Sequence, residues 1–173
     1  MLIYAIDPGA SMCGHVIFDG EKLHGSFQLN PAEMLYKIRS DVEELAYKQN
    51  GYERPCLAIE MIASQGMSVG QETFDTAMWV GRYVEAWDSC CFDSVLVYRR
   101  EIKLHICGDS RAKDANIRQA LIDRFGGKES AIGKKRSPGP LYEVSGHARA
   151  ALAVAAFCFD HLEGRVDTIR SKT

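Results

Sequence analysis

The feature that most constrains the fold is a series of short strand-like runs at the N-terminus. Residues 2–7 are rich in strand-forming side chains, and Pro8-Gly9 turns the chain directly afterwards. Residues 13–19 and 22–28 form two further runs of this kind, and the Asp19-Gly20 pair between them is typical of a β-hairpin turn. The chain therefore begins with strands that are joined by tight turns.

Helices and further strands alternate over the rest of the chain. Asn30 and Pro31 are residue types preferred at the N-cap and first position of a helix, which predicts a helix from there to about residue 50. We expect two more strands at residues 56–62 and 93–98, and further helices at residues 71–89, 100–106, 112–125 and 145–162. Residues 128–140 are polar and rich in Gly and Pro, which predicts a mobile loop. This order predicts an α/β fold with a mixed five-stranded sheet flanked by helices.

Length and composition favour one domain. We expect residues 1–163 to form it and residues 164–173 to be a polar C-terminal tail. No run approaches the roughly 20 apolar residues that span a bilayer, and no secretory signal is recognisable, so a cytoplasmic location is expected. The six cysteines include no C-x-x-C pair, which argues against a zinc knuckle and favours buried thiols.

Charge is distributed unevenly along the chain. The net charge is −2, but residues 99–136 hold eleven Lys and Arg against five Asp and Glu. This basic segment is therefore +6, and the rest of the chain is −8. The segment is either a surface that faces a polyanion or a solvated helix face, and charge alone does not separate the two.

Two of the apolar runs each carry one carboxylate, Asp7 at the end of the first and Glu60 within the run at 56–62. Neighbouring parallel strands would bring these acids close together, where like charges repel unless a cation lies between them. Two oxygen ligands on a rigid sheet suit Mg²⁺, with a substrate phosphate completing the coordination shell. Alternatively, each acid caps a strand end or pairs with a lysine.

The chain resembles RuvC-type Holliday-junction resolvases, which have the RNase H-like fold. A strand that ends in IDPG, a later strand that ends in AIE, the stretch from Arg100 to Lys113 and the Ala-rich segment 151–155 occur in the family's order. The sequence IEMIASQGM and the segment from Arg111 to Gly127 are most similar to phage-encoded members of the family. The resemblance implies a Mg²⁺- or Mn²⁺-dependent endonuclease with two ions, a branched-DNA substrate, a homodimer and a location in the host cytoplasm.

The resemblance also implies site residues. Asp7, Glu60 and His147 would be metal ligands and catalytic residues, and Lys103 and Lys113 would act beside the scissile phosphate. The final helix departs from the family pattern, because Ala150 stands where the last carboxylate is expected. Three explanations remain open: His147 serves as ligand or general base without that carboxylate, Ala150 is an engineered inactivating change, or another acid such as Glu143 reaches the site.

Further expectations concern DNA and partner contacts. The residues expected to bind DNA are Arg99, Arg100, Lys103, Arg111, Lys113, Lys134, Lys135 and Arg136, although each is a solvated cation in the alternative interpretation. The bacterial enzymes have an aromatic residue a few positions after the glutamate, which stacks on a junction base, whereas this chain has Ala63. Met67 is the nearest bulky apolar residue, and it either wedges between bases or has a core or lid role. The helix at 71–89 is expected to form the homodimer, through the residues Trp79, Val80, Tyr83 and Trp87, unless these pack in the core.

Three functional hypotheses follow. The first is a metal-dependent endonuclease that nicks branched DNA. The second is a catalytically impaired protein that binds branched DNA, which the alanine at residue 150 suggests. The third is a sugar-kinase-like or actin-like ATPase, whose chains also begin with a strand, an acid and a hairpin. The chain is short for the two domains of that class and has no recognisable second phosphate loop, which disfavours the third hypothesis.

Overall fold

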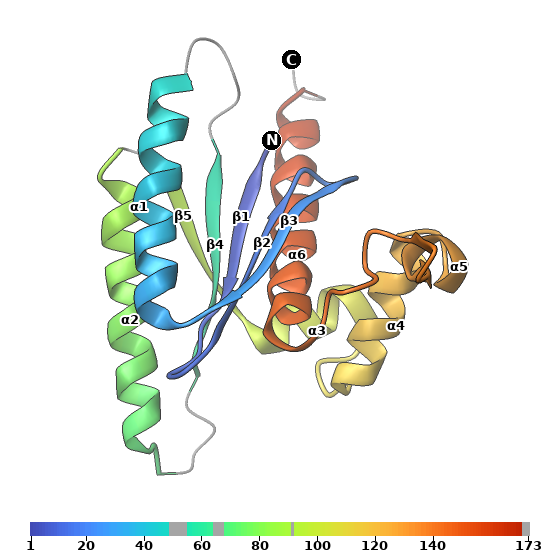
Figure 1. Cartoon of the computed structure of the whole chain (residues 1–173), viewed down its shortest axis with the longest axis horizontal. Coiled ribbons are helices and arrows are strands. Elements are labelled where there is room, and N and C mark those ends of the chain that lie inside the picture. The colour runs from blue at the N-terminus through green and yellow to red at the C-terminus, as the bar shows by residue number, and fades with distance from the viewer. Residues whose placement is uncertain (49–54, 64–67, 91, 171–173) are drawn as a thin grey trace.

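A five-stranded sheet forms the centre of the molecule in the computed structural model, which describes residues 1–48, 55–63, 68–90 and 92–170 (Figure 1). Its strands are β1 (Ile3–Asp7), β2 (Cys13–Phe18), β3 (Leu23–Leu29), β4 (Cys56–Met61) and β5 (Asp93–Tyr98). They lie in the order β3-β2-β1-β4-β5. β1 pairs antiparallel with β2 and parallel with β4, and β4 pairs parallel with β5. The predicted mixed sheet is therefore confirmed.

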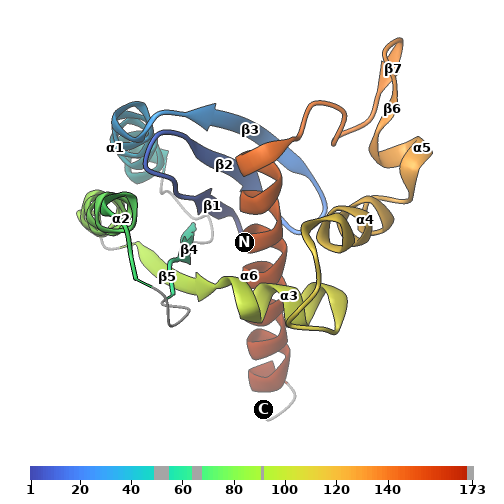
Figure 2. The ribbon, with the colours of Figure 1, turned by 90° about the horizontal axis from the view of Figure 1, so that it is seen from below.

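Two long helices cover one face of the sheet and a third covers the other. α1 (Pro31–Lys48) and α2 (Gln71–Asp88) pack side by side on one face, and α6 (Gly146–Arg170) crosses the opposite face (Figure 2). The side chain of Asn30 accepts hydrogen bonds from the N–H groups of Ala32 and Glu33, so the predicted N-cap of α1 is confirmed. α6 begins one residue after the predicted start and continues eight residues beyond the predicted end.

The opposite faces of the sheet support two separate hydrophobic cores. Alternate residues of β1 point to each side, so that Ile3 and Ala5 pack under α6 while Tyr4 and Ile6 pack under α1 and α2. The buried face of α6 is built largely from alanine, which allows its backbone to lie close to the sheet. This close packing positions the N-terminus of α6 at the end of β1.

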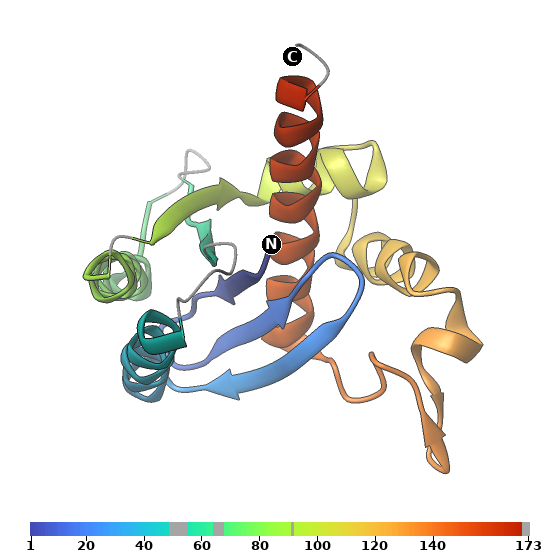
Figure 3. The same cartoon turned by 90° about the horizontal axis from the view of Figure 1, so that it is seen from above.

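The segment predicted as a loop, residues 128–140, contains short regular elements. It contains α5 (Lys128–Ala131), β6 (Gly133–Lys134) and β7 (Ser137–Pro138), and a two-residue turn joins the two short strands. The loop prediction was wrong because backbone hydrogen bonds from Gly139 to Ile132 and from Leu141 to Ala131 fix the segment on both sides. We call residues 133–138 the basic hairpin. It projects away from the sheet, beyond α3 (Arg99–Cys107) and α4 (Asp114–Arg124) (Figure 3).

The face of α2 also differs from expectation. Val80, Tyr83 and Trp87 are fully or almost fully buried between α2, α1 and the sheet, so they do not form an exposed dimer surface. Core packing is therefore the correct interpretation for these three side chains. The large apolar side chains that α2 exposes are Phe74 and Met78, which are 59% and 53% exposed.

Within the described ranges, no helix combines the length and the apolar character that would let it cross a membrane. The five described cysteines form no disulfide with one another, and Cys91 lies outside the described residues.

Candidate active site

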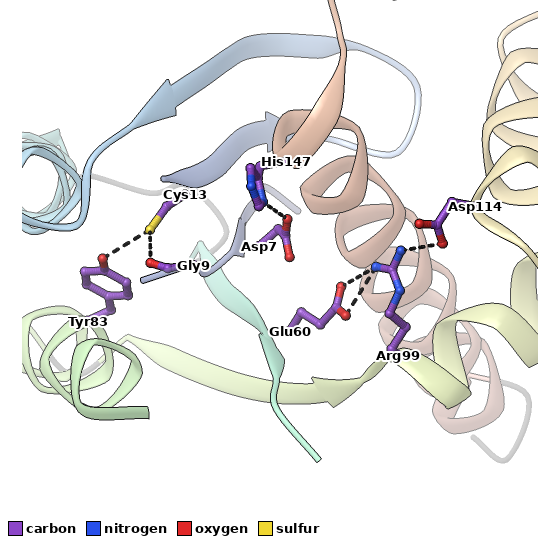
Figure 4. Close-up of polar contacts among 8 residues, drawn as sticks. All are labelled: Asp7, Gly9, Cys13, Glu60, Tyr83, Arg99, Asp114 and His147. Carbon is purple, nitrogen blue, oxygen red and sulfur yellow. Dashed lines mark hydrogen bonds and ion pairs between the residues drawn. The ribbon is translucent and has the colours of Figure 1, made fainter. Parts of the chain in front are cut away.

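Asp7 and Glu60 lie at corresponding positions on two neighbouring strands. In the parallel pairing of β1 with β4, Ile6 is opposite Ile59, so the next residue of each strand is a carboxylate at the same edge of the sheet. Their side chains are largely buried, with 15% and 12% of their surface exposed. The predicted proximity of the two acidic strand ends is confirmed (Figure 4).

His147 joins Asp7 from the opposite layer of the fold. It is the second residue of α6, and its Nδ1 lies 2.6 Å from Oδ2 of Asp7. Gly14 makes this approach possible because it faces Asp7 across the β1–β2 ladder and has no side chain. A Cβ at residue 14 would lie only 2.0 Å from the carbonyl carbon and oxygen of His147.

Arg99 and Asp114 extend the site toward the basic segment. Arg99, the first residue of α3, donates from Nη1 to both carboxylate oxygens of Glu60, at 3.2 and 2.9 Å. Its Nη2 donates to Oδ1 of Asp114, the first residue of α4, at 2.7 Å. A single guanidinium therefore connects the sheet carboxylate Glu60 to a carboxylate on a separate helix.

Burial dominates the electrostatics of the two sheet carboxylates. Burial raises the pKa of Asp7, although the hydrogen bond and charge of His147 and the charge of Arg99 act in the opposite direction. Burial likewise raises the pKa of Glu60, which the repulsion from Asp7 reinforces and Arg99 opposes. Burial alone would lower the pKa of Arg99, but the two acids that it bridges raise it. The acids are therefore incompletely neutralised by the protein itself.

These residues line one open cleft of about 430 Å³. Its lining consists of Asp7, Glu60, Arg99, Asp114, Ile117, Gly146, His147, Arg149 and Ala150. Ala150 is thus inside the cleft, so the position that lacks a carboxylate does face the site. A third acid does line the cleft, but it is Asp114 and not Glu143, the acid suggested by the sequence. Glu143 lines a separate groove with Lys135 and Tyr142. In the part of the chain that the structure describes, no three His, Cys, Asp or Glu side chains are grouped closely enough to hold a metal ion.

Apart from Arg99, the cations predicted to bind DNA do not line the cleft. Lys103 lies one helical turn after Arg99 on α3, and Lys113 immediately precedes Asp114 at the N-terminus of α4. Arg100 and Arg111 are exposed at the start of α3 and in the α3–α4 connection. The remaining three, Lys134, Lys135 and Arg136, occupy the exposed tip of the basic hairpin. Met67 lies outside the described residues.

A second polar network supports the turn behind Asp7. The thiol of Cys13 lies 3.5 Å from the Gly9 carbonyl oxygen and 3.5 Å from the hydroxyl of Tyr83 (Figure 4). The Tyr83 hydroxyl donates to the carbonyl oxygen of Pro31 at 3.1 Å. Burial raises the pKa of Tyr83, and the neighbouring thiol adds to the effect. Tyr83 of α2 therefore links Pro31 of α1 to Cys13, and the thiol of Cys13 contacts the turn that follows Asp7.

Sequence reasoning missed two residues of the cleft, Asp114 and Arg149. Asp114 was visible only as one acid within a basic segment, and no local pattern connects it to Glu60. Arg149 follows His147 on α6 and donates to the Val144 carbonyl oxygen at 3.3 Å. Its place in the final helix was a usable signal, because residues near His147 on that helix were expected to face the site.

Comparisons with known proteins support the fold. No family model matches the chain, and no curated protein matches its sequence. Among solved structures, RuvC of Thermus thermophilus superposes with a TM-score of 0.66 at 17% sequence identity, covering 95% of this chain and 97% of that one. The chain has the RuvC fold. The structure of T. thermophilus RuvC in complex with Holliday junction substrate also superposes, with a TM-score of 0.59 at 17% identity, covering 95% of this chain and 96% of that one. The predicted RNase H-like architecture is therefore confirmed at the level of the RuvC fold.

Proposed function

We propose that the protein is a RuvC-type endonuclease that nicks Holliday junctions or other branched DNA by hydrolysing phosphodiester bonds. The observation that carries the proposal is the juxtaposition of Asp7 and Glu60 at the ends of neighbouring parallel strands, with His147 of α6 hydrogen-bonded to Asp7. The RuvC fold supports it, because a protein with this fold has been solved with Holliday junction substrate. A phage origin and a location in the host cytoplasm belong to the same proposal.

The residues of the cleft fit a divalent cation such as Mg²⁺ or Mn²⁺. Asp7 and Glu60 are hard oxygen ligands on a rigid sheet, and burial leaves their charges incompletely neutralised. In the described structure these side chains are not grouped closely enough to hold an ion. We propose that Asp7, Glu60 and His147 would hold the metal after a change of side-chain rotamers, with two ions bound when the substrate phosphate contributes oxygen ligands. When bound, Mg²⁺ stabilises charge on the phosphodiester oxygens and makes water more acidic.

His147 is suited to move a proton. An ionised carboxylate only accepts hydrogen bonds, so the contact with Asp7 assigns the ring hydrogen of neutral His147 to Nδ1. The Nε2 atom then carries a lone pair, and the side chain is 45% exposed at the cleft. We propose that Nε2 either takes a proton from the attacking water or serves as the metal ligand. Asp7 orients the ring in both cases, as an acid does for a catalytic histidine in other enzymes.

The cations near the cleft are proposed to bind the DNA backbone. Lys103 and Lys113 flank Arg99 and Asp114 on α3 and α4, from which their flexible side chains would reach phosphates beside the scissile bond. Arg99 and Arg100 of α3 and Arg111 of the α3–α4 connection would extend this surface. The three cations of the basic hairpin would contact phosphates farther from the cleft, without sequence preference.

A homodimer is part of the proposal, with α2 as the contact helix. Phe74 and Met78 lie four residues apart and are exposed on one side of α2. Because a four-way junction has two symmetric strands to cut, two copies of the cleft would be needed for paired nicks. The proposed contact residues are therefore Phe74 and Met78, in place of Val80, Tyr83 and Trp87, which are buried in the core.

The alternative function is a protein that binds branched DNA and does not cut it. Ala150 faces the cleft, and the described side chains leave no three ligands grouped around one point. In this case the cations would still bind DNA, while the acids would not load a metal productively.

Cleavage of synthetic DNA distinguishes the two functions. Four-way, three-way and linear duplex substrates would be incubated with Mg²⁺ and with Mn²⁺. We expect the wild-type protein to nick the four-way junction, and Asp7→Asn and Glu60→Gln to bind it without cutting. Nicking by both variants at the wild-type rate would refute the endonuclease proposal. Tight binding with no cleavage by the wild type, and cleavage by Ala150→Asp, would establish the alternative.

A further inference from the structure

Arg99 lies between two acids of the cleft, Glu60 and Asp114, and occupies both oxygens of the Glu60 carboxylate that a bound cation would need. It directly follows β5, whose residue Tyr98 is paired with Met61 of β4, and this pairing brings Arg99 to the end of the strand that carries Glu60. One terminal nitrogen of its guanidinium is shared between both oxygens of Glu60. The other nitrogen is held by Asp114.

The ion pairs that Arg99 forms with Glu60 and Asp114 stabilise the cleft in the metal-free protein. Glu60 is largely buried, and a buried carboxylate requires a cationic or hydrogen-bonding partner. Arginine keeps its charge at every relevant pH, and its planar fork contacts two acceptors at once. Asp114 is 75% exposed, so its contact costs little desolvation and fixes the direction of the fork.

The arrangement is unfavourable for a divalent cation. Both oxygens of Glu60 already accept hydrogen bonds from Arg99, so a metal at Glu60 shares its ligand with a positive group. Like charges at this distance repel strongly in a partly buried site. Metal binding at Glu60 and the Arg99 bridge therefore oppose each other.

We propose that Arg99 is a positioning residue that competes with the divalent cation for Glu60 and that Asp114 anchors it in this position. The inference rests on the proposed function, because it concerns the metal that the endonuclease would use. Metal loading then requires the guanidinium to leave Glu60. Arg99 lies in the basic segment, so a DNA phosphate is the partner that would receive it. Asp7 is not bridged by Arg99, which makes Glu60 the ligand where the competition takes place.

Isothermal titration calorimetry of Mn²⁺ binding to the DNA-free protein at pH 8 tests the competition between Arg99 and the metal ion for Glu60. This pH lies well above the ordinary pKa of a glutamate, which limits proton uptake by Glu60 when its cationic partner is removed. We expect Arg99→Gln to bind Mn²⁺ about tenfold more tightly, because one charge at hydrogen-bonding distance commonly shifts an ionic equilibrium by about one to three powers of ten. Arg99→Lys keeps the charge without the fork and should lie between the two. Arg39→Gln is the matched control, since it removes one charge from an exposed position on α1 outside the cleft, and its Mn²⁺ affinity should stay within about twofold of wild type.

The control Arg99→Gln/Glu60→Gln identifies where the ion binds, because the gain in affinity should disappear in the double variant. Equal or weaker Mn²⁺ binding by a folded Arg99→Gln protein, as judged by circular dichroism, would overturn the inference. Failure of this inference is distinct from failure of the proposed function. Unchanged Mn²⁺ affinity together with loss of nicking in Asp7→Asn would reject the role of Arg99 alone. Tighter Mn²⁺ binding without any nicking would reject the endonuclease and retain the role of Arg99.

Discussion

The close approach of α6 to β2 at Gly14 provides the sharpest test of how the fold builds the cleft. The substitution Gly14→Ala adds one methyl group opposite Asp7 in the β1–β2 ladder. That Cβ would lie 2.0 Å from the carbonyl group of His147 and 2.4 Å from the nitrogen of Ala148. All three atoms belong to the backbone of the first turn of α6, so no side-chain rotation relieves the contact.

The size of the displacement follows from these distances. Ordinary van der Waals contact of a Cβ begins at 3.4 Å, so the first turn of α6 must move by about 1.4 Å or the strand must distort. Replacing a strand glycine with alanine would otherwise stabilise the protein by about 0.5–1 kcal/mol, whereas overpacking a core costs about 1–3 kcal/mol. The cost of overpacking exceeds the gain from replacing glycine, so we expect the free energy of unfolding to fall by about 1–2 kcal/mol. For a chain of this size, this corresponds to a fall of roughly 2–8 °C in Tm.

The effect on activity should exceed the effect on stability. His147 and Asp7 are joined by a hydrogen bond of 2.6 Å, which a shift of this size breaks. A catalytic group misplaced by about 1 Å commonly loses about 100-fold in rate. We therefore expect Gly14→Ala to nick four-way junctions about 100 times more slowly at 25 °C, below its unfolding transition, while junction affinity changes little.

Two measurements check this reasoning. Differential scanning fluorimetry would give Tm, and single-turnover nicking would give the rate. Gly81→Ala serves as the stability control, because a Cβ at this exposed position on α2 meets no atom within 4 Å. It should raise Tm slightly, as alanine favours a helix over glycine. A Gly14→Ala protein with wild-type Tm would refute the close approach, and a fall in Tm with an unchanged nicking rate would refute the link to His147.

Three further predictions concern surfaces and pH. Replacing the three cations of the basic hairpin with alanine should weaken junction binding and reduce the slope of log K against log salt by about two to three, as measured by fluorescence anisotropy. A Phe74→Glu/Met78→Glu double variant should sediment as a monomer, whereas the wild type should sediment as a dimer. Partial burial alone would raise the pKa of Asp160, but the hydrogen bonds that it accepts from Arg124 and His105 lower it. The ionised carboxylate of Asp160 therefore stabilises the fold above the ordinary pKa of 3.8, and this stabilisation is lost as the pH falls through the lowered value. Asp160→Asn should therefore lower Tm by a few degrees at pH 7, and the difference from wild type should diminish below about pH 4.

The sheet was predictable because its signals are local. A turn such as Asp19-Gly20 and a cap such as Asn30 act within a few residues, and both have the role in the structure that the sequence indicated. The short hairpin near Lys134 was missed because it depends on backbone hydrogen bonds to α5 rather than on a strand-like pattern. The exposed face of α2 was misassigned because an aromatic side chain such as Trp87 fits a core and an interface equally well by composition.

The cleft was predictable only where the sheet determines it. Asp7 and Glu60 follow apolar strands whose parallel pairing requires their ends to meet, so their proximity follows from the strand order. His147 depended on the resemblance of the final helix to a known family, because no local pattern relates it to residue 7. Asp114 was not predictable, since its place beside Glu60 depends on how α3 and α4 fold back and on the reach of Arg99.

The cleft therefore contains two kinds of residue, those held by the sheet and those held by the helices that follow it. The sheet carboxylates are held by a ladder of backbone hydrogen bonds and cannot move apart without loss of strand pairing. Arg99, which balances part of their charge, and Asp114, which anchors Arg99, lie at the starts of helices outside the sheet and have partly or largely exposed side chains. A helix start can shift by small backbone rotations, and a long side chain such as that of arginine changes rotamer without disturbing the core. The acids should therefore remain fixed as metal and DNA bind, and the response of the cleft should arise in the α3–α4 region.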